Sequence, residues 1–292
     1  MIGEQGKAAV MGEHVWKKRI AYGLIAALLF VLIAVTTFRD RTHRLERQKV
    51  RIVLFGDSVF GMPLDGISIP DYLGQLLGEP VFNAAFGGTC VCRVDSEYRL
   101  DYSKDAISLV ALTKAIEADD FGVQQTMRFR ESNSDDFADK IDSLETLDFS
   151  GVELVLIQQG LNDFYIGVPL DNENDPYDEH TFKGALRRSI RSLRQVNPDV
   201  RIVLMTQTYT WYKKTGDTCE EYDAGYGNQE AYVQAEIEIA EELGLELLDL
   251  YHDLFPHDSW EDWALYTVDG MHPNAAGCIM LAEVLADYLN GF

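Results

Sequence analysis

The chain has 292 residues, of which 47% are apolar, so it can form one large domain or two small ones with a sizeable core. Its formal net charge is -23 at pH 7. This charge argues against nucleic acid as a partner, because phosphate contacts need Lys and Arg clustered on one face, and the body of the chain has no such cluster.

The N-terminal part has the opposite charge balance and contains a long apolar segment. Residues 20–38 carry no charge and lie between basic residues. As a helix they would span about 28 Å, close to the thickness of a bilayer core. We expect a single-pass transmembrane anchor over 20–38, preceded by a short tail at 1–19. A cleaved signal peptide fits less well, because its apolar region is usually shorter and 34–36 is a poor cleavage site. A buried core helix fits the basic flanks least.

Two sequence features bear on the orientation of this anchor, and they favour opposite orientations. Six Lys or Arg follow the apolar segment and four precede it, which by the positive-inside rule leans against export. A short tail before a first hydrophobic segment, however, usually stays inside. We expect a membrane protein with a charged linker at 39–49 and an extracytoplasmic domain at 50–292.

Within that domain, short apolar runs alternate with helical patterns. Three of the runs are almost continuously apolar, which is typical of strands buried on both faces of a parallel sheet. The predicted strands are residues 50–55, 81–83, 152–158, 200–205 and 245–250.

The stretches between the strands have helical patterns. The predicted helices are residues 70–77, 103–118, 135–147, 181–195, 229–243 and 274–289. This alternation predicts right-handed crossovers and a three-layer α/β/α domain. Residues 163–180 and 209–228 lie outside the alternation, and are either surface loops near a binding site or solvated excursions.

A serine follows the first predicted strand, in the run Phe55-Gly56-Asp57-Ser58. This position lies at the carboxyl edge of a parallel sheet, where open α/β folds bind ligands. A serine after a strand more often only caps a turn. The run also lacks the second glycine of a G-x-S-x-G nucleophile elbow, which disfavours an ordinary α/β-hydrolase.

Near the C-terminus stands Asp269-Gly270-Met271-His272. An aspartate three residues before a histidine can accept the Nδ1 proton and leave Nε2 free as a base. A serine needs such a base, because its hydroxyl is a poor nucleophile until the proton is removed. The alternative is a surface turn with an incidental histidine.

Two further residues follow predicted strands. The amide of Asn162 can point at a developing oxyanion, and the backbone N–H of Gly88 can approach the same oxygen unhindered. The alternatives are a turn-forming Asn-Asp pair and tight loop packing.

In chain order, the motifs around Ser58, Gly88, Asn162 and His272 resemble the four sequence blocks of the SGNH (GDSL-like) hydrolases. Those blocks are a GDS block, a glycine block, a G-x-N-D block and a D-x-x-H block. The resemblance implies that Ser58 is the nucleophile and that His272, oriented by Asp269, is the base. It also implies an oxyanion hole made by the backbone N–H groups of Ser58 and Gly88 and the side chain of Asn162. The implied fold is a flavodoxin-like parallel sheet of five strands in the order 2-1-3-4-5.

The function that we expect is that of a serine esterase, a carboxylic ester hydrolase without cofactor or metal. The resemblance implies small acyl groups, such as acetyl, on carbohydrate or cell-surface glycan as substrates. The alternatives are an O-acyltransferase with the same triad, a lipid acylhydrolase or thioesterase, and a glycan-binding domain without catalysis. The oligomeric state stays open.

Cysteines and acidic loops give weaker signals. Cys90, Cys92, Cys219 and Cys278 have no metal-ligand spacing. In an exported domain Cys219 could pair with Cys90 or Cys92; equally, all four could be reduced thiols.

Residues 171–175 begin like an EF-hand, but proline and phenylalanine stand where its glycine and glutamate belong, so we expect no calcium site.

Aromatic residues follow the fourth predicted strand. Tyr209, Trp211 and Tyr212 could stack on a sugar ring, although such residues more commonly serve in packing.

Overall fold

The structure is a computed structural model, and it describes the greater part of the chain. The described residues are 22, 49–61, 67–94, 104–126, 135–212, 215–252, 254, 257 and 259–291. Apart from Tyr22 and Lys49, the predicted tail, anchor and linker lie outside them. Among the residues that are described, no helix is long and apolar enough to cross a membrane.

Five parallel strands form one sheet, as the alternation of strands and helices predicts. The strand order is β2-β1-β3-β4-β5, which is the order implied by the resemblance. The central strands β1 and β3 are buried along their whole length, which explains their continuous apolar sequence. The strands are β1 (Ile52–Gly56), β2 (Val81–Ala85), β3 (Leu154–Gln158), β4 (Arg201–Met205) and β5 (Glu246–Leu248).

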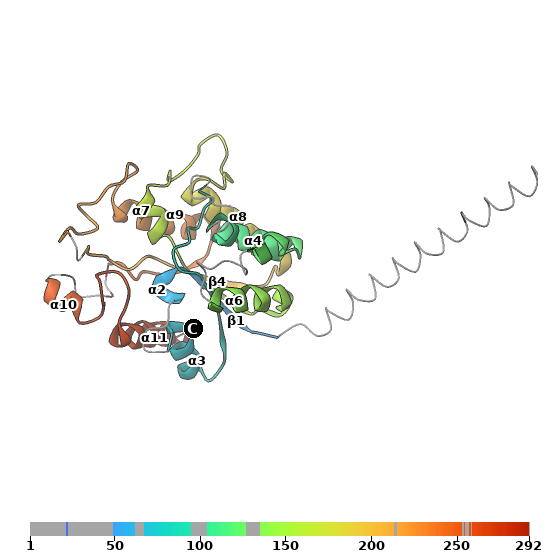
Figure 1. Ribbon diagram of the computed structural model, residues 1–292, viewed down its shortest axis with the longest axis horizontal. Helices are drawn as coiled ribbons and strands as arrows, with labels where there is room; N and C mark the ends of the chain where they lie inside the picture. Colours follow the sequence, from blue (N-terminus) through green and yellow to red (C-terminus); the bar gives the residue numbers. More distant parts are fainter. Residues whose placement is uncertain are drawn as a thin grey trace, which may run out of the picture. The chain divides into compact units, whose positions relative to one another are not determined.

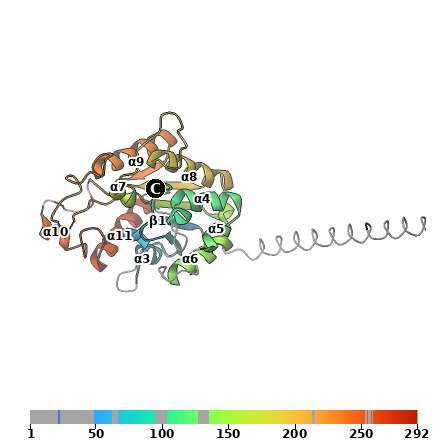
Figure 2. The same cartoon turned by 45° about the horizontal axis from the view of Figure 1, so that its top comes forward.

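Helices cover both faces of this sheet and make the predicted three layers (Figures 1 and 2). On one face, α3 (Ile69–Leu77) and α11 (Ala275–Asn290) lie side by side. The other face is covered by α4 (Leu109–Ala118), α8 (Phe182–Val196) and α9 (Gln229–Leu243). A further helix, α6 (Asp135–Thr146), packs beside β2.

The remaining helical elements are short. They are α2 (Ser58–Gly61), η2 (Lys104–Ile107), α5 (Gly122–Gln125), η4 (Phe149–Gly151), α7 (Leu161–Ile166) and α10 (Trp260–Ala264). The sequence predicted none of them as separate elements, because three to six residues are too few to show a helical period.

One predicted helix is divided in two. The stretch 103–118 contains the 3₁₀ turn η2 and then α4, because Ser108 is an N-cap between them. Its hydroxyl accepts a hydrogen bond from the backbone N–H of Ala111 at 3.3 Å. A serine side chain in this role starts a new helix at the residue after it.

The last predicted strand is shorter in the structure than in the sequence analysis. Residues 245–250 form only the three-residue β5, because the chain turns at Asp249. The Asp249 carboxylate accepts the backbone N–H of Tyr251 at 3.0 Å, and the hydroxyl of Thr206 accepts that of Leu250 at 2.7 Å. These bonds replace a continued strand ladder.

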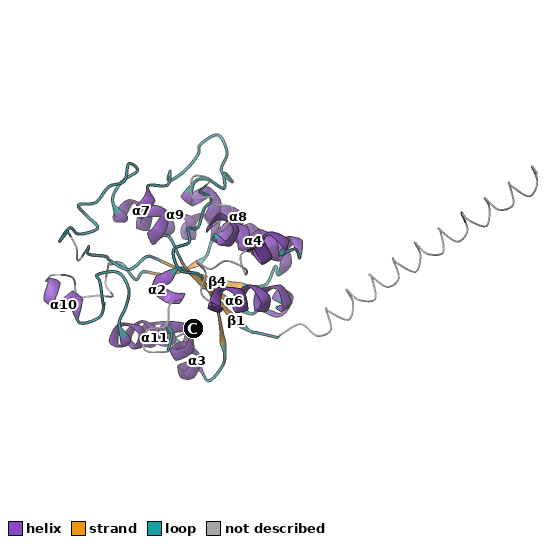
Figure 3. Cartoon of the chain, viewed as in Figure 1, coloured by secondary structure: helices purple, strands orange, loops and turns teal. Residues whose placement is uncertain are grey.

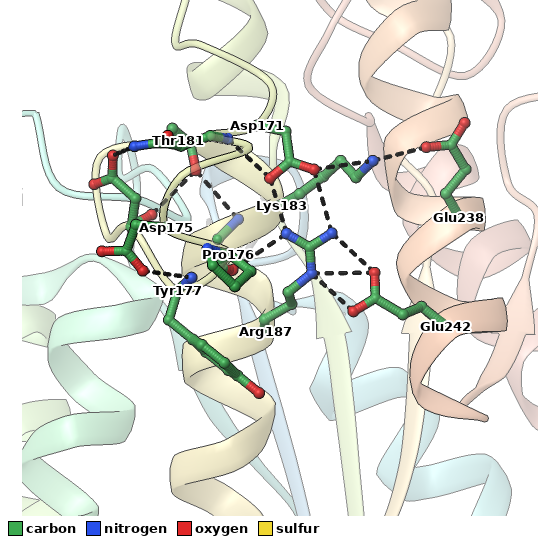
Figure 4. A network of polar contacts seen from close by, with 12 residues as sticks. Asp171, Asp175, Pro176, Tyr177, Thr181, Lys183, Arg187, Glu238 and Glu242 are labelled. Carbon is green, nitrogen blue, oxygen red and sulfur yellow. Dashed lines mark hydrogen bonds and ion pairs between the residues drawn. The ribbon is translucent and has the colours of Figure 1, made fainter.

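The loop before α8 is held by the buried Arg187 of that helix (Figure 4). Its guanidinium donates to Asp171 in the loop at 2.8 Å and to Glu242 of α9 at 2.8 Å. Lys183, one turn earlier on α8, donates to Glu238 at 2.8 Å. The hydrogen bond from Arg187 lowers the pKa of Asp171. The acidic loop is therefore cross-linked to two helices through its charges.

All four cysteines are buried, and none of them is in a disulfide. Of the two alternatives that the sequence leaves open, the structure has the reduced one. The Cys92 Sγ lies 3.0 Å from a carboxylate oxygen of Asp163, and the Cys219 Sγ lies 3.6 Å from the hydroxyl of Tyr251.

Candidate active site

Ser58, His272 and Asp269 come together at the carboxyl edge of the sheet. His272 Nε2 lies 2.9 Å from Ser58 Oγ, and His272 Nδ1 lies 2.7 Å from Asp269 Oδ2. Ser58 is the first residue of α2, directly after β1, and the other two precede α11. Figure 3 shows long loops on the side of the sheet where α2, α7 and α10 lie. A serine, a base and a carboxylate in series are the arrangement that activates a hydroxyl for attack.

The turn from Asp269 to His272 fixes the imidazole through the backbone. Asp269 Oδ1 accepts the N–H groups of Met271 at 3.0 Å and of His272 at 2.8 Å. Burial raises the pKa of Asp269, but these bonds and the one from the imidazole outweigh burial, so that its pKa lies below the ordinary value. The carboxylate is therefore ionised near neutral pH and can orient the ring. The backbone N–H of Trp211 adds a bond to the Gly270 carbonyl at 3.0 Å.

Asp57, the residue before Ser58, ties the serine turn to β3 and α7. It is fully buried, and its carboxylate accepts the backbone N–H of Val59 at 2.9 Å and that of Gly160. The Asn162 amide approaches its other oxygen at 3.4 Å. Burial raises the pKa of Asp57 to about 6.

Asn162 and Gly88, the two other predicted residues, line one small cavity of about 50 Å³. Asn162 lies in the first turn of α7, and its Nδ2 donates to the Thr89 carbonyl at 3.0 Å. Gly88 has a φ of 74°, in the left-handed region that a side chain disfavours. The structure thus brings all five predicted site residues to one edge of the sheet.

Asp163 holds the loop after β2 against α7. Its buried carboxylate accepts the backbone N–H groups of Val91 at 2.8 Å and Cys92 at 3.2 Å. Burial raises the pKa of Asp163 to about 7 and also raises the pKa of the Cys92 thiol. Gln159 adds a bond to the hydroxyl of Thr89 at 2.8 Å. The loop that carries Gly88 is therefore fixed to the segment that carries Asn162.

The sequence analysis did not assign Asp57, Asp163 or any exposed aromatic residue to the site. The signal for both acids was present, since each directly follows or precedes a motif residue at the end of a buried strand. Among the aromatics, Tyr209 and Tyr212 are buried, with 3% and 7% exposure, and serve in packing. Tyr165, on α7 three positions after Asn162, has an exposed ring, at 42%.

Comparisons with known proteins show the family of the chain. The model of the GDSL-like lipase/acylhydrolase family matches residues 54–278. The fold and the family together define the class: the chain belongs to the GDSL-like lipase/acylhydrolase family. It is an ester hydrolase of the SGNH type. A comparison with curated proteins returns no match.

Several solved structures share the fold. A protein from Lactobacillus plantarum is 20% identical with a TM-score of 0.58, covering 84% of this chain and 98% of its own. A possible lipase from Chitinophaga pinensis is 18% identical with a TM-score of 0.55, covering 82% and 97%. A putative GDSL-like lipase from Bacteroides ovatus is 12% identical with a TM-score of 0.50, covering 84% and 100%. At these identities the likeness concerns the fold alone.

Proposed function

We propose that Ser58, His272 and Asp269 form a catalytic triad that hydrolyses small acyl esters, above all acetyl esters of carbohydrate or cell-surface glycan. The observation that carries this proposal is the continuous contact from Ser58 Oγ through the imidazole to the Asp269 carboxylate, at 2.9 Å and 2.7 Å. A histidine held in one tautomer by an ionised carboxylate is suited to general-base catalysis.

The reaction has two steps. His272 Nε2 takes the Ser58 proton while Oγ attacks the ester carbonyl, and the tetrahedral intermediate expels the alcohol, which receives that proton from His272. Water then attacks the acyl-serine with His272 as base. The bond to Ser58 Oγ breaks, the acid leaves, and the serine regains its proton.

The oxyanion hole of this proposal consists of the backbone N–H groups of Ser58 and Gly88 and the side chain of Asn162. One hydrogen of the Asn162 amide is engaged by Thr89 at 3.0 Å. The contact with Asp57, at 3.4 Å, is long for an N–H···O bond. We assign this second hydrogen to the oxyanion, because a developing negative charge at a shorter distance is a better acceptor.

The size of the cavity supports a small acyl group. At about 50 Å³ it is far below the roughly 300–1,000 Å³ of pockets that hold drug-sized ligands. Beside Gly88 and Asn162 it is lined by Cys90, Cys92, Val94 and Ile166, together with the acidic Asp105. An acetyl methyl fits such a space and a long acyl chain does not, which favours an esterase over a lipid acylhydrolase.

Hydrolysis of p-nitrophenyl acetate by the full chain in detergent tests the triad. We expect turnover to be lost in Ser58→Ala and in His272→Ala and kept in His252→Ala, which alters another surface histidine. Turnover that survives in the first two variants contradicts the triad. Butyrate and octanoate esters test the acyl pocket, since a preference for octanoate favours the lipid acylhydrolase. Acyl transfer to an added sugar alcohol in the same assay would reveal an acyltransferase.

We also propose that residues 20–38 anchor the protein in a membrane with the hydrolase domain outside. The proposal is supported by the length of the uncharged segment and its basic flanks. Full-length protein should remain with membranes after a high-salt wash, and protease added outside the cell should cleave the domain. Recovery of intact full-length protein in the soluble fraction would contradict the anchor.

A further inference from the structure

Tyr165 lies on the same face of α7 as Asn162. The two residues are three positions apart, so their side chains are neighbours on one helical turn. Ile166, the next residue, lines the small cavity together with Asn162 and Gly88. The Tyr165 ring is 42% exposed. An exposed aromatic ring therefore stands directly beside the group that we assign to the oxyanion.

Two other tyrosines fix the position of this ring. Tyr222 stacks on Tyr165 with centroids 5.4 Å apart and planes at 24°, and its hydroxyl donates to the Tyr165 carbonyl at 2.9 Å. Tyr212 meets the Tyr165 ring edge to face at 5.2 Å. Because the ring is already held, a ligand that stacks on it loses little further side-chain entropy.

The backbone at the end of α7 is fixed to the same loop. Gly167 has a φ of 72°, and a Cβ placed there would lie 2.5 Å from the Ala224 carbonyl oxygen. Only glycine permits this approach of the helix end to the loop. The position of the Tyr165 ring is thus set by both the side chains and the backbone.

The same cluster reaches the histidine turn. Tyr212 follows Trp211, whose backbone N–H donates to the carbonyl of Gly270 at 3.0 Å, between Asp269 and His272. The aromatic cluster therefore extends from the Asn162 side of the site to the His272 side. The alcohol leaves from the His272 side, because the imidazole must protonate it.

We propose that Tyr165 is the stacking face of a subsite for the alcohol part of the ester, and that this part is a neutral sugar ring. The inference rests on the proposed function and names its substrate class. A flat ring held rigidly suits the C–H face of a pyranose, as aromatic walls of ligand sites commonly do. Residues 209–228, which carry Tyr222, contain four acids and two lysines, and this acidic excess disfavours an anionic sugar.

The experiment compares two acetyl esters that differ in the alcohol, methyl 6-O-acetyl-glucopyranoside and ethyl acetate, with the full chain in detergent. Acetate release gives kcat and KM for each. In Tyr165→Ala the KM for the sugar ester should rise about five- to tenfold relative to that for ethyl acetate, which is the size of one stacking contact. Tyr165→Trp should keep the ratio near that of the wild type, because it restores a flat ring.

Tyr177→Ala is the matched control. Tyr177 has the same exposed fraction, 42%, but its ring packs on the guanidinium of Arg191, at 5.4 Å, and not on the site. This variant should leave the ratio unchanged. Because Tyr165 also packs on two tyrosines, Tyr165→Leu serves as a second variant that keeps apolar bulk, and it should shift the ratio as alanine does.

The outcomes separate the inference from the proposed function. If the wild type hydrolyses neither ester and Ser58→Ala changes nothing, the proposed function fails. If the wild type hydrolyses both esters through Ser58 and the ratio stays constant in Tyr165→Ala and Tyr165→Leu, the stacking subsite is overturned. A wild type that prefers an acetylated sugar acid to the neutral sugar overturns the assignment of a neutral ring.

Discussion

Asp249 and His252 stand in the same relationship as Asp269 and His272. The ring Nδ1 lies 2.6 Å from the carboxylate in the first pair and 2.7 Å in the second. In both, the carboxylate also accepts backbone N–H groups within the turn. The partner of the other ring nitrogen differs. The Nε2 of His252 faces Glu230 at 3.3 Å, whereas that of His272 faces Ser58 at 2.9 Å. A D-x-x-H turn therefore becomes a catalytic candidate only through the residue that its histidine meets.

This pair of turns gives the first prediction. Asp269→Asn should lower kcat on p-nitrophenyl acetate by about 10²- to 10⁴-fold, because the amide no longer fixes the productive tautomer of His272. Asp249→Asn makes the same chemical change in the other turn and should leave kcat within about twofold. Equal losses in the two variants would mean that the effect is one of folding and not of catalysis.

A second prediction concerns the amide of Asn162. Asn162→Ala should lower kcat by about 10²- to 10³-fold with little change in KM, as expected for a donor that acts mainly in the transition state. Asn197 is a suitable control, since its amide also holds a backbone carbonyl, that of Val152, at 2.7 Å. Asn197→Ala should lower the Tm and leave kcat unchanged. A change in KM alone for Asn162→Ala would contradict the role.

The third prediction concerns pH and stability. Burial raises the pKa of Asp163 from 3.8 to about 7, so the folded protein keeps a proton that the unfolded chain has released. This contribution to the free energy of unfolding is fully present below about pH 4 and is lost as pH rises through about 7. At most it amounts to about 4 kcal/mol.

Thermal unfolding between pH 4 and pH 8 measures this contribution. Other acids titrate in the same window, so the difference between wild type and Asp163→Asn is the informative quantity. The decrease in Tm towards pH 8 should be smaller in the variant by several degrees. Parallel curves for the two proteins would show that Asp163 is not the titrating group.

A fourth prediction tests the network of Figure 4. Arg187→Ala should lower the free energy of unfolding by about 2–3 kcal/mol, because it removes charged hydrogen bonds to Asp171 and Glu242 and leaves both carboxylates without that partner. Arg191→Ala changes an exposed residue of the same helix and should cost less than about 0.5 kcal/mol. Urea unfolding measures both values. Similar midpoints for the two variants would show that the network contributes little.

Much of the fold could be predicted from the sequence, because its strands are buried on both faces. The run 152–158, for instance, is almost wholly apolar and contains β3, whose five residues are all buried. The ends of elements were less predictable, since they depend on side-chain caps such as those of Ser108 and Asp249. The hydrophobic pattern of a sequence does not indicate where such a side-chain hydrogen bond forms.

The site could be predicted in part. Ser58, Asn162 and His272 belong to short motifs whose chemistry can be recognised from the sequence alone. Asp163 and Tyr165 are different, because their surroundings come from chain segments far away in sequence. The burial that raises the pKa of Asp163 and the tyrosines that hold the Tyr165 ring exist only in the folded domain.

The proposed nucleophile and its base come from opposite ends of the described domain, Ser58 after the first strand and His272 before the last described helix, 214 positions apart. Closing so long a loop costs only about 0.6 kcal/mol more for each doubling of its length, but it requires all of the chain between the two residues. A nascent chain still on the ribosome carries the serine without the histidine. Ester cleavage thus begins only after His272 has been synthesised, and its onset reports that these two segments of the domain have met.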